Sequence, residues 1–195
     1  TALGYNVLGS NTTGQYNIGI GGNDSTNLST LFNNTTGNSN VAVGYGSLTT
    51  DTLGDRNVAI GVSALETQNF TTTTDSYNVG VGYTAGQSIT TGIYNTFLGG
   101  DAGKSLTDAD FNTAVGTFAL DKDELGCRST ALGYAALSTQ DFTTATDVYN
   151  TAVGFHAGVA VTTGVENTFV GGNCGDATDD GRENTAVGSH ALSGN

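Results

Sequence analysis

The sequence predicts an all-β protein folded as a parallel β-solenoid, or β-roll, of about eleven coils, most of them 17-residue units, with no significant helix. Three observations support this fold class. One short motif recurs along the whole chain, a longer 72-residue period lies on top of it, and each repeat is too short for a strand–helix–strand crossover. Such a repeat accommodates two short strands and two turns, and stacked repeats form parallel sheets. We therefore expect residues 1–195 to form a single solenoid domain.

The motif is an Asn, a β-branched residue, a small residue, an aliphatic residue and a Gly, as in 112–116 and 184–188. Alternation with period two is typical of a strand, and nothing sustains the 3.6-residue period of a helix. The positions of successive motif glycines differ by 17, 23, 17, 21, 17, 17, 17, 21, 17 and 17, so irregular longer coils are expected near 22–40, 66–78 and 138–150. These glycines are Gly4, Gly21, Gly44, Gly61, Gly82, Gly99, Gly116, Gly133, Gly154, Gly171 and Gly188.

The 72-residue period indicates that a four-coil unit is duplicated. Gly61 and Gly133 occupy the same place in the two copies, since 133 − 61 = 72, and the segment 67–72 recurs with one substitution as 139–144. The chain also begins inside a repeat and has no initiator Met, so we expect it to be a segment of a longer fibre.

Winding once per motif places like residues above one another in columns. We expect the motif Asn side chains to hydrogen-bond along the stack, as amide ladders do in cross-β assemblies. The motif glycines, Gly61 to Gly188, are expected to adopt a left-handed or bulged turn that a Cβ would oppose. The predicted Asn ladder comprises Asn57, Asn78, Asn95, Asn112, Asn150, Asn167 and Asn184.

The two faces of the predicted strand differ in bulk. The residue before each motif Gly is always aliphatic, and the residue before that is mostly Ala or Gly, with Phe97 and Phe169 as paired exceptions. We expect the small residues to line a narrow interior and the aliphatic column to pack against a second surface, although the opposite orientation remains open. An outward aliphatic column predicts self-association, as a homotrimer or as an end-to-end polymer.

Composition excludes several partners. The chain has 18 acidic and 5 basic residues, for a net charge of −13, so its surface repels the phosphates of nucleic acid. No apolar run approaches the roughly 20 residues of a membrane span, so we expect no membrane insertion by this segment. Cys127 and Cys174 fall on different positions of separate coils, so no disulfide is predicted.

The run 112–120 resembles the head repeat of trimeric autotransporter adhesins, and similar repeats occur in the shafts of phage tail fibres. The resemblance covers essentially the whole chain, although 17-residue coils are longer than those of the autotransporter head. It implies a left-handed roll, three chains about a common axis, and an attachment role outside the cell or on a virion.

Few residues are arranged for chemistry. His156 and His190 lie two coils apart, about 10 Å by strand spacing, which is too far for shared zinc ligation. Acidic residues gather in turns, where calcium remains an alternative to solvation. The segment 99–105 resembles a phosphate-binding loop but is one copy of the repeat. We therefore predict no catalytic, cofactor or metal site, and a protein that is not an enzyme.

The predicted function is that of a structural and adhesive fibre segment that binds a glycan or a cell-surface receptor. Aromatic residues and insertions are the candidate receptor contacts, although packing between chains also accounts for exposed aromatics. Alternatives are a self-assembling filament subunit, a polysaccharide-processing enzyme and an ice-binding rod, the last disfavoured because valines interrupt the Thr column. The candidate contacts are Phe32, Phe70, Tyr83, Tyr134 and Phe142.

Overall fold

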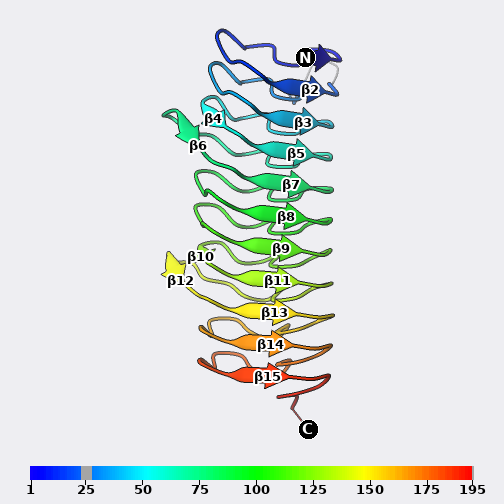
Figure 1. Cartoon of the computed structure of the whole chain (residues 1–195), viewed down its shortest axis with the longest axis vertical. Coiled ribbons are helices and arrows are strands. Elements are labelled where there is room, and N and C mark those ends of the chain that lie inside the picture. The colour runs from blue at the N-terminus through cyan, green and yellow to red at the C-terminus, as the bar shows by residue number, and fades with distance from the viewer. Residues whose placement is uncertain (23–27, 195) are drawn as a thin grey trace.

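The computed structural model describes residues 1–22 and 28–194, which form a straight rod of stacked coils (Figure 1). The described residues contain β-strands and no helix. One face of the rod is an eleven-stranded sheet in which each strand pairs with the strands of the coils before and after it. Its strands are β1 (Ala2–Leu3), β2 (Ile18–Ile20), β3 (Val41–Val43), β5 (Val58–Ile60), β7 (Val79–Val81), β8 (Thr96–Leu98), β9 (Thr113–Val115), β11 (Thr130–Leu132), β13 (Thr151–Val153), β14 (Thr168–Val170) and β15 (Thr185–Val187).

Every pairing in this sheet is parallel and places motif on motif. Thr130 of β11 lies between Thr113 of β9 and Thr151 of β13, and the following residues pair in the same register. The parallel solenoid predicted from the repeat is therefore confirmed, with a 17-residue period in its regular coils. The left-handed sense of winding stays a prediction.

The central residue of each three-residue strand in this sheet points into the rod. Ala59 and Ala114 are fully buried, whereas the aliphatic residues that follow the strand centre, such as Ile60 and Leu98, are 39% and 47% exposed. The small face therefore lines the interior and the bulky face points outward, which excludes the opposite orientation. Buried leucines four residues after the motif Gly, such as Leu65 and Leu120, fill the space opposite the alanines.

Phe97 and Phe169 fit the same narrow interior because the leucines are missing beside them. A Cβ on Gly86 or Gly103 would lie 2.4 Å or 2.3 Å from the Phe97 ring, and these glycines occupy the position of Leu65 and Leu120 in other coils. Around Phe169, Gly158 and Gly175 likewise occupy the position at which other coils have a leucine. One large ring thus replaces two leucine side chains, as close packing requires.

Two structural features require glycine at the last position of the motif. Their φ angles lie between +125° and +141°, a region that side chains with a Cβ rarely adopt. An added Cβ would also meet the next coil: at Gly116 it would lie 2.4 Å from the carbonyl oxygen of Gly133. At Gly188, which has no described coil after it, a Cβ would meet nothing within 4 Å.

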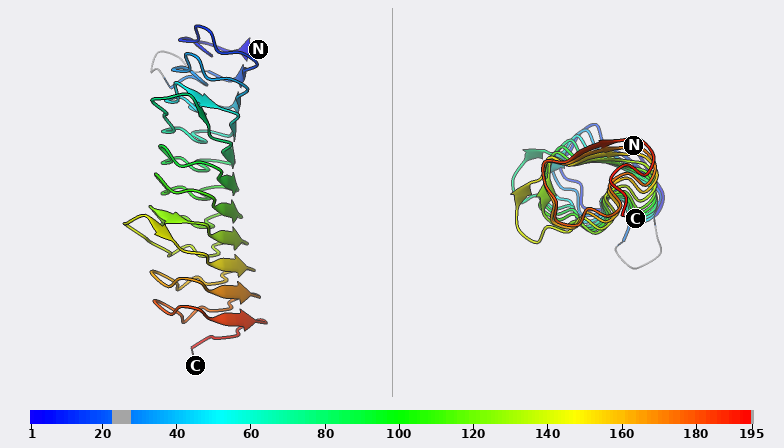
Figure 2. Two further views of the ribbon diagram at one scale, coloured as in Figure 1. Left: turned by 60° about the vertical axis from the view of Figure 1, so that its left-hand side comes forward. Right: turned by 90° about the horizontal axis from the view of Figure 1, so that it is seen from below.

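The two 21-residue coils leave the rod as projections that pair with the coil before them. Strand β6 (Thr74–Asp75) pairs in parallel with β4 (Gly54–Asp55), and β12 (Thr146–Asp147) pairs in the same way with β10 (Gly126–Cys127). Both projections extend from the same side of the rod (Figures 1 and 2). Of the insertion expected near 22–40, residues 23–27 lie outside the described residues.

Candidate functional site

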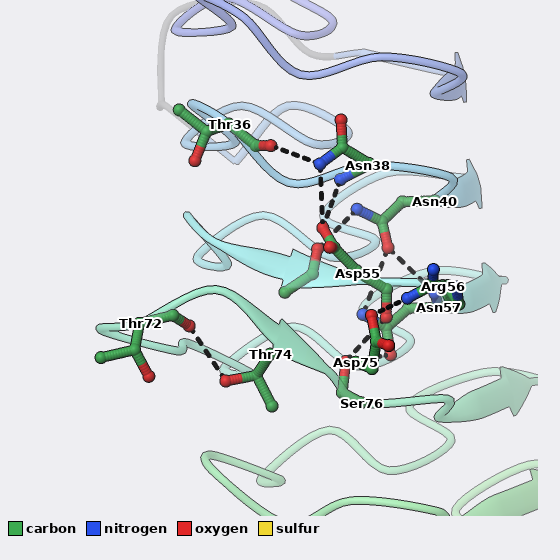
Figure 3. Close-up of polar contacts among 11 residues, drawn as sticks. Thr36, Asn38, Asn40, Asp55, Arg56, Asn57, Thr72, Thr74, Asp75 and Ser76 are labelled. Atoms are coloured by element: carbon green, nitrogen blue, oxygen red, sulfur yellow. Dashed lines mark hydrogen bonds and ion pairs between the residues drawn. The ribbon is translucent and has the colours of Figure 1, made fainter.

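The motif Asn residues connect successive coils, but mainly through the backbone rather than as an amide-to-amide ladder. Asn78 Oδ1 accepts a hydrogen bond of 2.9 Å from the backbone N–H of Asn95, and Asn95 Nδ2 donates one of 2.7 Å to the carbonyl of Ala109. Both side chains are fully buried. A direct amide-to-amide bond does occur where Asn57 Nδ2 donates to Asn40 Oδ1 at 3.2 Å, as Figure 3 shows. The predicted column exists, with each side chain bonded to an adjacent coil.

A second polar column lies at the neighbouring turn. Asp55 accepts a hydrogen bond of 2.6 Å from the backbone N–H of Asn38 in the preceding coil (Figure 3). Asp110 accepts one of 2.8 Å from the backbone N–H of Ile93 in the same way. Cys127 occupies the same position, and its Sγ accepts the N–H of Asp110 at 3.3 Å. Cys127 is half-buried, and burial raises the pKa of its thiol. Cys174 is buried, and both cysteines are free.

A buried carboxylate fixes each projection to the rod. Asp51 is 1% exposed; its carboxylate accepts hydrogen bonds from Gln68 Nε2 at 2.7 Å and from the backbone N–H groups of Gly54 at 3.1 Å and Phe70 at 3.3 Å. Gln68 Oε1 in turn accepts a bond from Asn78 Nδ2 at 2.9 Å. Burial raises the pKa of Asp51 although these hydrogen bonds oppose the shift.

The second projection repeats this arrangement. Asp123 is fully buried and accepts hydrogen bonds from Gln140 Nε2 at 2.5 Å and from the backbone N–H of Phe142 at 2.9 Å. Burial also raises the pKa of Asp123. Because neither carboxyl is accessible to solvent, the two most deeply buried acids with shifted pKa values belong to the architecture and cannot meet a substrate.

These anchors correct the prediction for two of the candidate receptor contacts, whereas Phe32 stays a prediction. Phe70 and Phe142 are only 5% and 7% exposed, because the hydrogen bond from each backbone N–H holds the start of the projection against the rod. Phe32 is half-buried, and its ring lies against the preceding coil, where a Cβ on Gly9 would be 2.9 Å from Phe32 Cε2. The exposed parts of the projections are instead threonine-rich, at 71–73 and 143–144.

One row of rings lies along the edge of the sheet where its strands begin, and we call it the upstream row. Tyr77 stacks on Tyr94 and Tyr94 on Phe111, with centroids 5.6 Å and 5.2 Å apart. Arg56 covers the Tyr77 ring at 5.5 Å, and Arg128 covers Phe111 at 4.8 Å. Neighbouring coils therefore cover both faces of Tyr77, Tyr94 and Phe111, so a sugar cannot stack on these three rings.

The two arginines join the upstream row to the projections. Arg56 forms an ion pair with Asp75 of β6, drawn in Figure 3, and Arg128 forms one with Asp147 of β12, with Nε and Oδ1 2.8 Å apart. The four side chains are partly exposed, so water and salt screen both pairs and each contributes little to stability. The arrangement holds each projection beside the sheet.

The downstream row consists of the residues that directly follow the motif glycines at the other edge of the sheet. Its two candidate contacts, Tyr83 and Tyr134, are 63% and 45% exposed. Tyr134 stacks on Phe155 at 5.4 Å, and His156 stacks on Phe155 at 4.0 Å. The structure therefore leaves Tyr83 and Tyr134 on the surface, unlike Phe70 and Phe142. All four lie outside the predicted strands, so the strand pattern alone did not distinguish these two groups.

The remaining polar groups do not converge on a reaction centre in the described part of the chain. His190 is exposed, with Nε2 3.4 Å from Asn173 Nδ2, and His156 is half-buried. In residues 1–22 and 28–194 we find no surface pocket and no group of three or more His, Cys, Asp or Glu side chains suited to a metal ion. The same residues contain no helix long and apolar enough to cross a membrane.

The chain is thus a solenoid with an apolar sheet face, two rows of exposed rings and a pair of anchored projections. A comparison with models of known protein families finds none that matches it, and comparisons with curated proteins and with solved structures find no match either.

Proposed function

We propose that this chain is a non-catalytic rod segment of a fibre on a cell or virion surface, where it serves as spacer and attachment module. The proposal includes association of three copies through the outer face of the eleven-stranded sheet. The number three comes from the resemblance of the motif to trimeric adhesin heads and tail-fibre shafts. The chemical nature of the sheet face supports the association itself.

The observation that carries the proposal is an uninterrupted aliphatic column on the outer face of the sheet. Large hydrophobic side chains point outward in this column along the whole sheet, for example Leu98 at 47%, Leu132 at 44% and Val170 at 37% exposed. The column beside it, formed by the first residue of each three-residue strand, is Ile or Val from β2 to β7 and Thr from β8 to β15. No strand of this sheet contains a charged residue, although the chain has a net charge of −13. Charge repulsion between copies is therefore weakest at this face, where apolar burial favours contact.

The size of the face approaches that of a stable interface. Ten inter-coil steps of about 4.8 Å give a length of about 50 Å, and the five motif positions between the two aromatic rows span about 13 Å. The resulting strip measures about 650 Å², compared with about 800 Å² per partner in a typical stable complex. A face of this area lies at the upper end of the range for the apolar patches of a monomer.

The attachment role is supported by the paired projections. They are related by the 72-residue repeat, extend from the same side and carry exposed threonines on anchored stems. Insertions that leave a solenoid on one side are often its binding elements. In a trimer the projections would be repeated on each chain, which favours multivalent attachment.

Light scattering coupled to size-exclusion chromatography tests the association. A trimer should have three times the 19.7 kDa mass of the single chain. The charge-introducing variants Leu98→Glu and Leu132→Glu should shift the mass to the monomer, whereas Thr72→Glu, on a projection, should not. A monomeric wild type would refute the proposal, and open-ended polymers would favour the filament alternative.

A further inference from the structure

At two positions of the downstream row, nothing within the chain requires the residue to be glycine. Gly100 and Gly172 follow motif glycines, and neither has a positive φ. A Cβ on Gly100 would meet only Thr117 Cγ2, at 4.0 Å, and one on Gly172 only the carbonyl oxygen of Phe155, at 3.9 Å. Neither backbone conformation nor crowding therefore requires Gly here, in contrast to Gly99 and Gly171 directly before them.

Each of these glycines follows an exposed aromatic ring in the row. Tyr83, 63% exposed, precedes Gly100 by one coil, and Phe155, 54% exposed, precedes Gly172 by one coil. In both cases the Gly leaves open the space that a side chain would occupy beside the ring. The 72-residue repeat relates the two arrangements, so the feature is present twice on the rod.

The ring of Phe155 shows which face is open. Tyr134 and His156 both stack against it, with centroids at 5.4 Å and 4.0 Å, and they are 5.5 Å from each other. Rings on opposite faces of Phe155 would be much farther apart, so both cover the same face. Tyr134 belongs to the preceding coil, and the face directed toward Gly172 is therefore uncovered.

Each of these glycines is followed by a residue with a side-chain oxygen, whose backbone N–H donates to the carbonyl of the ring residue, Asp101 to Tyr83 at 2.9 Å and Asn173 to Phe155 at 2.8 Å. Asp101 follows Gly100, and its Oδ1 accepts a hydrogen bond from Thr84 Oγ1 at 2.5 Å and pairs with Lys104 Nζ at 2.9 Å. Partial burial opposes ionisation, but the bond from Thr84 and the Lys104 ammonium lower the pKa of Asp101, which stays an acceptor. At the second position Asn173 follows Gly172.

We infer that these two notches, Tyr83–Gly100–Asp101 and Phe155–Gly172–Asn173, are a duplicated pair of saccharide-binding sites. A pyranose ring offers an apolar C–H face to an aromatic ring and hydroxyls to a neighbouring carboxylate or amide, the combination that both notches share. A cationic ligand is disfavoured because the second notch has an amide in place of the carboxylate. Anionic ligands are disfavoured by the net charge of −13.

The spacing of the sites favours an extended or clustered glycan. Four coils separate the notches, about 19 Å along the rod. Each notch is shallow and offers one ring face, so single-site binding is weak, and simultaneous occupation raises the apparent affinity by about 10² or more. This inference rests on the proposed attachment role: it names the ligand class and adds a binding surface in the downstream row to the one proposed on the projections.

The test is binding of the full chain to an array of neutral and anionic glycans, followed by saturation-transfer NMR with a neutral oligosaccharide that binds. Gly100→Val and Gly172→Val fill the notches without straining the backbone, and Tyr83→Ala removes one platform. We expect each single variant to weaken array binding at least tenfold and the double Gly100→Val/Gly172→Val variant to abolish it. Tyr45→Ala, which removes an exposed ring of the same row that borders neither notch, is the matched control for Tyr83→Ala and should bind as the wild type does.

The outcomes separate this inference from the proposed function. Failure of the wild type to retain any neutral glycan, or equal binding by the double variant, would overturn the saccharide sites, while a trimeric mass would leave the fibre proposal intact. If filling the notches changed the mass instead of glycan binding, the notches would accommodate a neighbouring chain and the inference would be wrong. A monomeric wild type whose glycan binding is lost in the double variant would support the sites and refute the trimer.

Discussion

Replacement of Phe97 by Ala should lower the free energy of unfolding, because the Phe97 ring fills interior space that belongs to its own coil and to the coils beside it. The side chain is fully buried, and its ring occupies the space beside Gly86 and Gly103. Removal of a buried Phe side chain costs about 3–5 kcal/mol when the surroundings cannot collapse. Here the neighbours are glycines in fixed turns, so we expect a loss near the upper end of that range.

The matched rescue is the triple variant Phe97→Ala/Gly86→Leu/Gly103→Leu, which restores the interior of the regular coils. Leucines at this position already adopt the required left-handed conformation, with φ of 50° at Leu65 and 53° at Leu120. Strain of about 1 kcal/mol per Leu offsets part of the regained packing. We expect the triple variant to lie within about 2 kcal/mol of the wild type.

On the wild-type background the same glycine substitutions should have the opposite effect. A Cβ at Gly86 would be 2.4 Å from the Phe97 ring, so Gly86→Leu overpacks the interior and should cost at least about 1–3 kcal/mol. The substitution thus stabilises one background and destabilises the other. Such a reversal is expected only for side chains that compete for one volume.

Denaturant unfolding followed by circular dichroism measures these effects as shifts of the midpoint, since a repeat array can depart from two-state unfolding. The corresponding set Phe169→Ala/Gly158→Leu/Gly175→Leu provides an independent copy of the experiment. A triple variant no more stable than Phe97→Ala, at both positions, would refute the volume exchange.

Three further predictions concern the columns and the anchors. Gly116→Ala should cost several kcal/mol, because backbone strain of about 1–3 kcal/mol at its positive φ adds to a clash with Gly133. Gly188→Ala should cost only the strain, since its Cβ would meet no neighbouring coil. Equal decreases of the melting temperature for the two variants would contradict this explanation. Asn112→Ala should cost about 2–4 kcal/mol in urea unfolding, because it removes hydrogen bonds of 2.9 Å to Ser129 and to Gly126. Asn112→Ser, which introduces the residue found at 129, should cost less. A larger loss of stability for Asn112→Ser than for Asn112→Ala would count against the Asn ladder. Burial raises the folded-state pKa of Asp51 and Asp123 above the ordinary 3.8, so protonation of these groups favours the folded state, and the free energy of unfolding falls as the pH rises from below 3.8 through the raised values. The double variant Asp51→Asn/Asp123→Asn should flatten this pH dependence in unfolding curves measured from pH 3 to 7. An unchanged pH dependence would exclude these two groups as its source.

The register of the sheet could be predicted because every coil repeats the same five-residue motif. Thr113, Thr130 and Thr151 lie above one another for that reason, as the equal spacing of the motif indicated. The direction of the two strand faces remained open, since Ala–Val alternation is compatible with either. The structure decides it through the turn leucines: with Leu120 inside, the interior has room for Ala114 but not for an aliphatic column as well.

The paths of the long coils could not be predicted from the repeat, because they depend on interior side chains that break it. Position seven after the motif Gly holds Ile89 and Leu106 in regular coils, but Asp51 precedes one projection and Gln68 lies at its start. The recurrence of this Asp–Gln pair in the second copy of the 72-residue repeat was the available signal. Without it, Phe70 was expected on the surface, although the pair buries it.

The hydrogen bonds between coils, such as the one from Asn95 N to Asn78 Oδ1, run along the axis of the rod. When the rod is pulled at its two ends, the hydrogen bonds between one pair of coils therefore break before those between the next pair, and the strands are not all sheared at once. A 17-residue coil that unravels changes from about 4.8 Å of rod to roughly 50 Å or more of extended chain. A rod pulled at its two ends is thus expected to lengthen roughly tenfold for each coil that unravels, so that stretching absorbs energy coil by coil.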